Sequence, residues 1–147
     1  RDAVAARAEE VFGTRPRPSV LFLVGLDPVF AAGPGAFVDD MIRIAGGVNA
    51  VAQADGAPGP WPQLSLEAIV DLDPDIIVGA LEGHGEAQEH LLQVLRERSG
   101  WRELSAVRQG RVYPVNPDLT VRTGPRIMGG LELLAEIIQG QVEEGDG

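Results

Sequence analysis

The fold is decided by the stretch Pro58-Gly-Pro-Trp-Pro-Gln-Leu-Ser-Leu-Glu-Ala-Ile-Val-Asp-Leu-Asp-Pro-Asp-Ile-Ile-Val78. Its closely spaced prolines remove backbone donors and favour extended neighbours, which predicts a stiff loop around Trp61. Ser65 is the expected N-cap of a short helix, because apolar residues follow it at helical spacing. That helix must end before Pro74, and the apolar residues that close the stretch predict a buried strand.

Outward from this stretch, apolar runs and helical stripes alternate along the chain. The expected strands are 19–25, 75–78 and 111–115, the expected helices are 1–13, 37–45, 87–98 and 123–138, and the expected loops are 27–35, 48–60 and 79–85. Pro114 cannot donate to a sheet ladder, which favours an edge position for its strand. Strands that alternate with helices predict an α/β fold with a mainly parallel central sheet flanked by helices.

Composition limits the function classes. The chain has 147 residues, a net charge of -10 and no cysteine. Nucleic acid is excluded as a partner because phosphate binding needs clustered basic residues, and disulfides and thiolate metal sites are excluded as well. No apolar run approaches the length of a membrane span. The chain starts at Arg1, inside an expected helix, so we expect it to be a piece of a longer protein.

Several chemical motifs find little support. The Gly33-Pro-Gly35 loop lacks the third small residue of a dinucleotide fingerprint, and no P-loop lysine follows. No serine lies in a nucleophile elbow. A metal site would draw on the imidazoles and carboxylates of Glu82, His84, Glu86, Glu89 and His90. A solvated helix start explains this acidic segment better than a metal site does.

Asp118 and Arg122 bracket a short loop ahead of the last helix. Together they offer an acceptor, a bidentate donor and free backbone N–H groups at one place, which suits a polar ligand. The alternative is that the two side chains pair with each other and brace the loop. The spacing does not separate these interpretations.

Short motifs run in a fixed order from about Pro18 to Ile138. They are the Phe30 loop, Gly46-Gly-Val-Asn49, Trp61-Pro-Gln-Leu-Ser-Leu-Glu67, Asp73-Pro-Asp-Ile-Ile-Val78, Trp101 to Leu104, Gly110-Arg-Val-Tyr113 and Gly124-Pro-Arg126. The ordered set resembles the C-terminal lobe of the class III substrate-binding proteins of ABC importers, which capture cobalamin, haem or ferric siderophores. The cobalamin-binding branch is the most similar. The resemblance implies two Rossmann-like lobes joined by a long helix, and the first lobe is not in this sequence.

The resemblance also implies roles for individual residues. Trp61 corresponds to an aromatic ring that packs on cobalamin, Phe30 to another apolar wall, and Asp118 and Arg122 to a polar pair at the amide-bearing edge of the ligand. Glu67 corresponds to a surface glutamate that docks on arginines of the membrane permease. The implied protein is extracytoplasmic, with a membrane anchor placed in the absent N-terminal part. It is not an enzyme and needs no cofactor, since the corrinoid or metal chelate is its cargo.

The resemblance leaves the ligand open. A haem or ferric-siderophore receptor has the same scaffold, and His84 would then be a candidate iron ligand. An α/β enzyme acting on a small metabolite is a more distant alternative. We expect residues 1–15 to end the connecting helix, 16–139 to form the lobe and 140–147 to be a flexible acidic tail. An isolated lobe would expose its apolar half-site, which predicts some self-association.

Overall fold

A mixed sheet organises the part of the chain that the computed structural model describes, which is Ala6, Glu10 and residues 17–26, 29–33, 37–53, 62–80, 90–115 and 134–139. The labelled elements are β1 (Ser19–Leu26), β2 (Val29–Ala31), α2 (Phe37–Ala45), β3 (Val48–Asn49), the 3-10 helix η1 (Ala50–Gln53), β4 (Gln63–Leu64), α3 (Leu66–Leu72), β5 (Ile76–Gly79), α5 (Leu91–Arg96), the 3-10 helix η2 (Trp101–Glu103), α6 (Ser105–Arg108) and β6 (Val112–Pro114). Ala6, Glu10 and residues 134–139 are also helical.

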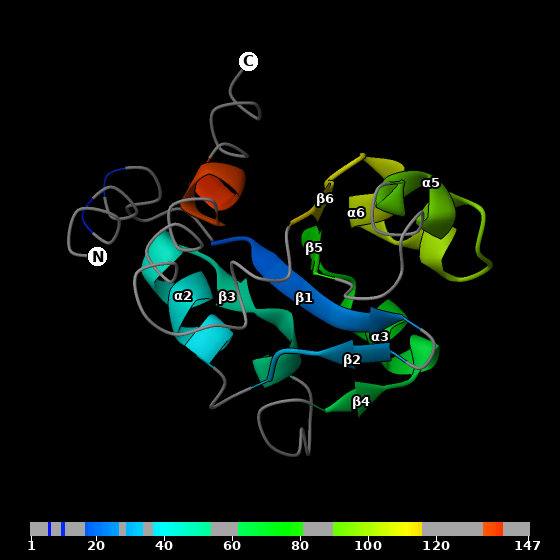
Figure 1. Ribbon diagram of the computed structural model, residues 1–147, viewed down its shortest axis with the longest axis horizontal. Coiled ribbons are helices and arrows are strands. Elements are labelled where there is room, and N and C mark those ends of the chain that lie inside the picture. The colour runs from blue at the N-terminus through cyan, green and yellow to red at the C-terminus, as the bar shows by residue number, and fades with distance from the viewer. Residues whose placement is uncertain are drawn as a thin grey trace.

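The strand order is β4-β2-β1-β5-β6, and β3 pairs with β1 ahead of β2 along the same edge (Figure 1). The pairs β1–β3, β1–β5 and β5–β6 are parallel. The pairs β1–β2 and β2–β4 are antiparallel. The predicted α/β class with a mainly parallel sheet is therefore confirmed, and so is the edge position of β6 within the described sheet. The antiparallel pairs were not expected.

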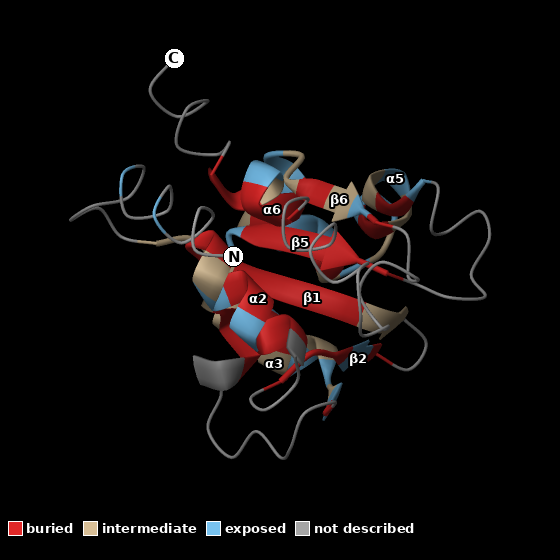
Figure 2. Ribbon diagram, turned by 60° about the vertical axis from the view of Figure 1, so that its left-hand side comes forward, coloured by how far each residue is buried: buried red, intermediate tan, exposed pale blue. Residues whose placement is uncertain are grey.

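β1 is buried on both faces, as its continuous apolar sequence predicts. Val20 and Phe22 pack in one cluster with α2 and the helical residues 134–139. Leu21 and Leu23 point the other way, into a cluster with α3, α5 and α6. Figure 2 shows the resulting layers, with buried strands between helices whose outer faces are exposed.

The Asp73-Pro74-Asp75 turn, which joins α3 to β5, is hydrogen-bonded to two other parts of the chain. Ser65 Oγ accepts from Ala68 N at 3.1 Å, which confirms the predicted N-cap, and α3 ends before Pro74 as expected. The Asp73 carboxylate accepts from Ser105 N at 3.0 Å and so caps the start of α6. The Asp75 carboxylate accepts from the N–H of Ser19 at 2.9 Å, at the start of β1. This turn therefore aligns α3, α6 and the two central strands.

Gly100 is required where the chain turns from α5 into η2. Its φ is +86°, and a Cβ at this position would lie 2.5 Å from Leu66 Cδ2. Gly100→Ala is therefore expected to lower the free energy of unfolding by about 2 kcal/mol, measured by chemical denaturation. Gly110→Ala is the matched control, because Gly110 also has a positive φ of +74° but a Cβ there would come no nearer than 3.6 Å to another residue. The control isolates the backbone cost of about 1 kcal/mol, and equal losses in both variants would contradict the clash with Leu66.

Two predictions about local structure were wrong, and one helix was not predicted. Residues 29–31 lie in the expected loop 27–35 but form β2, because Val29 and Ala31 point into the core and the strand pairs with β1. The expected loop 48–60 contains β3 and η1. Residues 105–108 form the unpredicted helix α6. These four elements are short, and their stability depends on tertiary contacts rather than on a sequence pattern. Of the expected helix 87–98, Leu91–Arg96 form α5, which ends two residues earlier than predicted, and residues 87–89 lie outside the described residues.

Candidate functional site

The parallel strands β1, β5 and β6 end at one edge of the sheet. The register places four residues in a row across it: Ala31 opposite Leu23, Leu23 opposite Gly79, and Gly79 opposite Pro114. We call the side beyond this row, where β1, β5 and β6 end, the carboxyl edge. Ligands of mainly parallel α/β proteins bind outside this edge of the sheet, so it is the natural place for a site.

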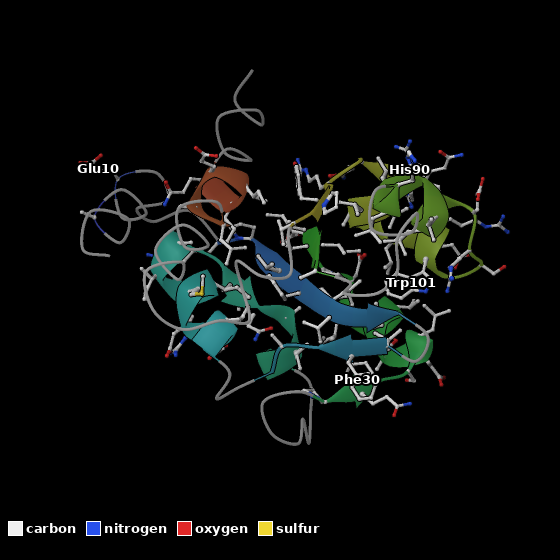
Figure 3. All side chains as sticks on the ribbon, in the orientation of Figure 1. Glu10, Phe30, His90 and Trp101 are labelled. Atoms are coloured by element: carbon white, nitrogen blue, oxygen red, sulfur yellow. The ribbon has the colours of Figure 1, made fainter. Side chains whose placement is uncertain are left out.

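Phe30 is an exposed aromatic residue at the carboxyl edge. It lies opposite Gly25 of β1 and Gln63 of β4. Val29 and Ala31 are buried on one face of β2, so the intervening Phe30 side chain points to the other face, and it is 36% exposed. Phe30 and Val70 are the exposed large hydrophobic residues within the described part of the chain. Figure 3 shows the Phe30 ring beside β2 and β4. An aromatic face left uncovered at this edge is suited to contact a ligand.

The other predicted ligand residues, Trp61, Asp118 and Arg122, lie outside the described residues, as does His84. Their neighbours in sequence are described. Trp61 directly precedes Pro62, whose carbonyl oxygen accepts from Ala31 N at 3.2 Å. The segments that contain His84 and the Asp118–Arg122 pair begin after β5 and β6, which end at the carboxyl edge. The described backbone therefore brings the starting points of the segments with His84 and with Asp118 and Arg122 to the same edge as Phe30, and it places Pro62 beside Ala31.

Glu67 lies in the first turn of α3 and is exposed. The positive end of the helix dipole favours a carboxylate at this position. Among the described residues, Glu67 has no ion-pair partner. A role of Glu67 in docking on a permease stays a prediction.

A buried polar cluster was missed by sequence reasoning. Asn49 is 1% exposed, and its Nδ2 donates to Ala32 O and to Asp39 Oδ1, each at 3.0 Å. Arg43 Nη2 reaches Asp39 Oδ2 at 3.4 Å. The only sequence signal was the asparagine that closes the Gly46-Gly-Val-Asn49 motif, which gives no indication of its partners.

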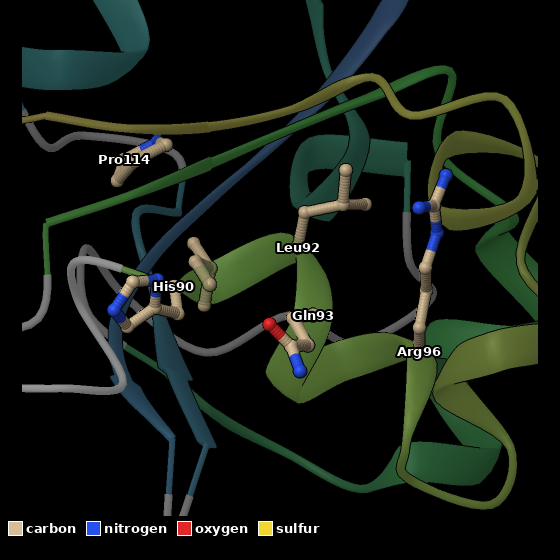
Figure 4. A pocket seen from close by; sticks show the side chains of 6 residues that line it. His90, Leu92, Gln93, Arg96 and Pro114 are labelled. Atoms are coloured by element: carbon tan, nitrogen blue, oxygen red, sulfur yellow. The ribbon is translucent and has the colours of Figure 1, made fainter.

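A pocket of about 400 Å³ lies between α5 and the end of β6. It is lined by His90, Leu91, Leu92, Gln93, Arg96 and Pro114 (Figure 4). Pro114 belongs to the row that defines the carboxyl edge, so the pocket flanks that edge. Of the residues considered for a metal site, only His90 is described. The described residues contain no group of three or more metal-ligating side chains, and none of their helices is long and apolar enough to cross a bilayer.

Comparison with known proteins identifies the family. The model of the periplasmic binding protein family matches residues 2–119. An uncharacterized ABC transporter substrate-binding lipoprotein of Bacillus subtilis is 40% identical over 82% of this chain and 35% of its own length. A cobalamin-binding protein of Halobacterium salinarum is 34% identical over 92% of this chain and 36% of its own length.

A solved structure supports the same assignment. The periplasmic heme-binding protein RhuT of Roseiflexus sp. RS-1 is 30% identical, with a TM-score of 0.73 over 96% of this chain and 53% of that one. The chain thus spans about a third of the curated relatives and about half of this structure. The family predicted from the ordered motifs is confirmed: the chain belongs to the periplasmic binding proteins.

Proposed function

We propose that this chain is the C-terminal lobe of an ABC importer's substrate-binding protein and that it forms half of a site for a cobalamin-type corrinoid. The observation that carries the proposal is the exposed ring of Phe30 at the carboxyl edge, on a strand bonded to the segment that follows Trp61. Two aromatic residues on adjoining segments suit a large, flat ligand. Stacking buries much apolar area and immobilises few rotatable bonds.

Polar groups complete the proposed half-site. Asp118 offers an acceptor and Arg122 a bidentate donor for the amide-bearing edge of a corrinoid. The other half belongs to the lobe that this sequence does not contain. A cobalamin-binding protein among the relatives supports the corrinoid over other ligands of the family. The proposed protein carries cargo and catalyses no reaction, in keeping with its solute-binding relatives.

Calorimetric titration of the complete receptor, with both lobes, tests the proposal. Cyanocobalamin is expected to bind tightly with one-to-one stoichiometry, and hemin is expected to give no response. Hemin binding without cobalamin binding would overturn the corrinoid assignment and keep the importer role. If neither ligand binds, the cobalamin and haem assignments both fail, and a ferric siderophore becomes the ligand to test.

A haem receptor is the second candidate, because the solved relative at 30% identity is a heme-binding protein. His84 would then supply an iron ligand from the segment after β5. His84→Ala would remove the absorption band of ligated haem in the complete receptor. An unchanged spectrum would exclude His84 as the ligand.

Glu67 is proposed to dock on arginines of the importer's permease outside the cytoplasm. Glu67→Arg places a like charge at that contact, and it is expected to weaken permease binding on the order of tenfold. Binding is measured between the purified complete receptor and the permease in nanodiscs. Glu103→Arg is the matched control, since Glu103 is also exposed but lies on η2. Equal losses in the two variants would indicate a general charge effect, and ligand affinity is expected to be unchanged in both.

A further inference from the structure

We infer that Asn49 is a positioning residue, whose side chain holds the end of β2 and thereby fixes the exposed ring of Phe30. The inference rests on the proposed function, because Phe30 is there a wall of the ligand site. Asn49 itself is 1% exposed and has no access to ligand. Its effect on binding would therefore pass through the strand.

The backbone needs a polar side chain at this point of the sheet. One edge of β1 pairs first with β3, where Val20 lies opposite Asn49, and then with β2, where Leu23 lies opposite Ala31. Backbone groups at such a change of partner are not all satisfied by a regular ladder. Ala32, the residue after β2, donates its N–H to Phe22 O at 2.9 Å and accepts at its carbonyl from Asn49 Nδ2. The end of β2 is therefore held from both sides.

The amide of Asn49 is fully engaged. Its Nδ2 bonds Ala32 O and Asp39 Oδ1, and its Oδ1 accepts from Val51 N at 3.1 Å. Because a carboxylate only accepts, Asp39 fixes which end of the amide carries the donors. Asp39 is itself 8% exposed and is paired with Arg43. An apolar side chain at position 49 would leave the Ala32 carbonyl and the Val51 N–H without these bonds.

Phe30 is sensitive to this support because its strand is short. β2 has three residues, and its outer neighbour β4 has two. Such small pieces of sheet open locally at low cost. Phe30 lies two residues before Ala32 on the same segment. Holding Ala32 thus limits the positions that the ring samples before ligand arrives, which lowers the ordering cost of binding.

Hydrogen exchange of the complete receptor without ligand tests the structural step. In Asn49→Ala, the amides of residues 29–33 are expected to exchange about tenfold faster, as for loss of a typical hydrogen bond, with little change in β5.

Gln139→Ala is the matched control. Gln139 is 3% exposed, and its Nε2 donates to Ala45 O at 3.0 Å, at the far end of α2. The control is expected to leave residues 29–33 unchanged. An equal increase in β2 and β5 of Asn49→Ala would overturn the inference. Should that variant not fold, Asp39→Ala, which removes one partner of the amide, is expected to give a smaller increase confined to β2.

A double-mutant cycle with cyanocobalamin tests the functional step. Asn49→Ala is expected to lower affinity about threefold to tenfold when Phe30 is present, and to have no further effect in Phe30→Ala. Independent losses in the two variants would show that Asn49 does not act through Phe30 and would overturn the inference. Failure of cyanocobalamin to bind the unaltered receptor would count against the proposed ligand alone. In that case the exchange result still decides whether Asn49 holds β2.

Discussion

Phe22→Ala is expected to lower the free energy of unfolding by about 3–5 kcal/mol, because it opens a cavity at the centre of the sheet. Phe22 is fully buried on β1 and is among the largest fully buried side chains. It lies opposite Val78 of β5, and its ring packs in the cluster that joins the sheet to α2. A change of this size is a large fraction of the stability of an ordinary domain.

Phe30→Ala is the matched control, since the same atoms are removed from the adjoining strand. Phe30 is 36% exposed, so the surface that it loses to truncation is already partly in water. We expect a loss below about 1 kcal/mol in urea denaturation followed by circular dichroism. A loss at Phe30 comparable to that at Phe22 would mean that the Phe30 ring is buried in solution. That outcome would remove Phe30 from the proposed ligand wall as well.

The sequence predicts those elements whose signal is local. The apolar run of β1, the Ser65 cap of α3, the stop before Pro74 and the buried strand β5 follow from propensity, capping and periodicity. The edge position of β6 follows from Pro114 alone. These elements suffice to define an α/β sheet and the edge at which we propose that a ligand binds.

The remaining elements depend on contacts between distant residues. β2 and β3 share one edge of β1, and no pattern in three or two residues predicts that arrangement. α6 begins at Ser105, where the carboxylate of Asp73 provides the cap from far away in sequence. The partners of Asn49 come from α2, from the end of β2 and from η1. For the candidate site, the family resemblance implies Phe30 as an apolar wall, but it does not indicate the strand β2 that presents the ring.

Trp61→Ala in the complete receptor is expected to weaken cyanocobalamin binding by about 1–3 kcal/mol, as for truncation of an aromatic anchor at an interface. The expected loss reflects the apolar area that an indole buries when it stacks on a flat ligand. Calorimetric titration measures this loss of affinity, at a temperature where the unaltered receptor and the variant are both folded.

Trp101→Phe is the control. Trp101 is the other tryptophan of the chain, is 4% exposed and packs in the same apolar cluster as α5 and α6. Trp101→Phe should therefore reduce stability and leave affinity unchanged. Unaltered affinity in Trp61→Ala would remove Trp61 from the site, and parallel losses in both variants would trace the effect to folding rather than to stacking.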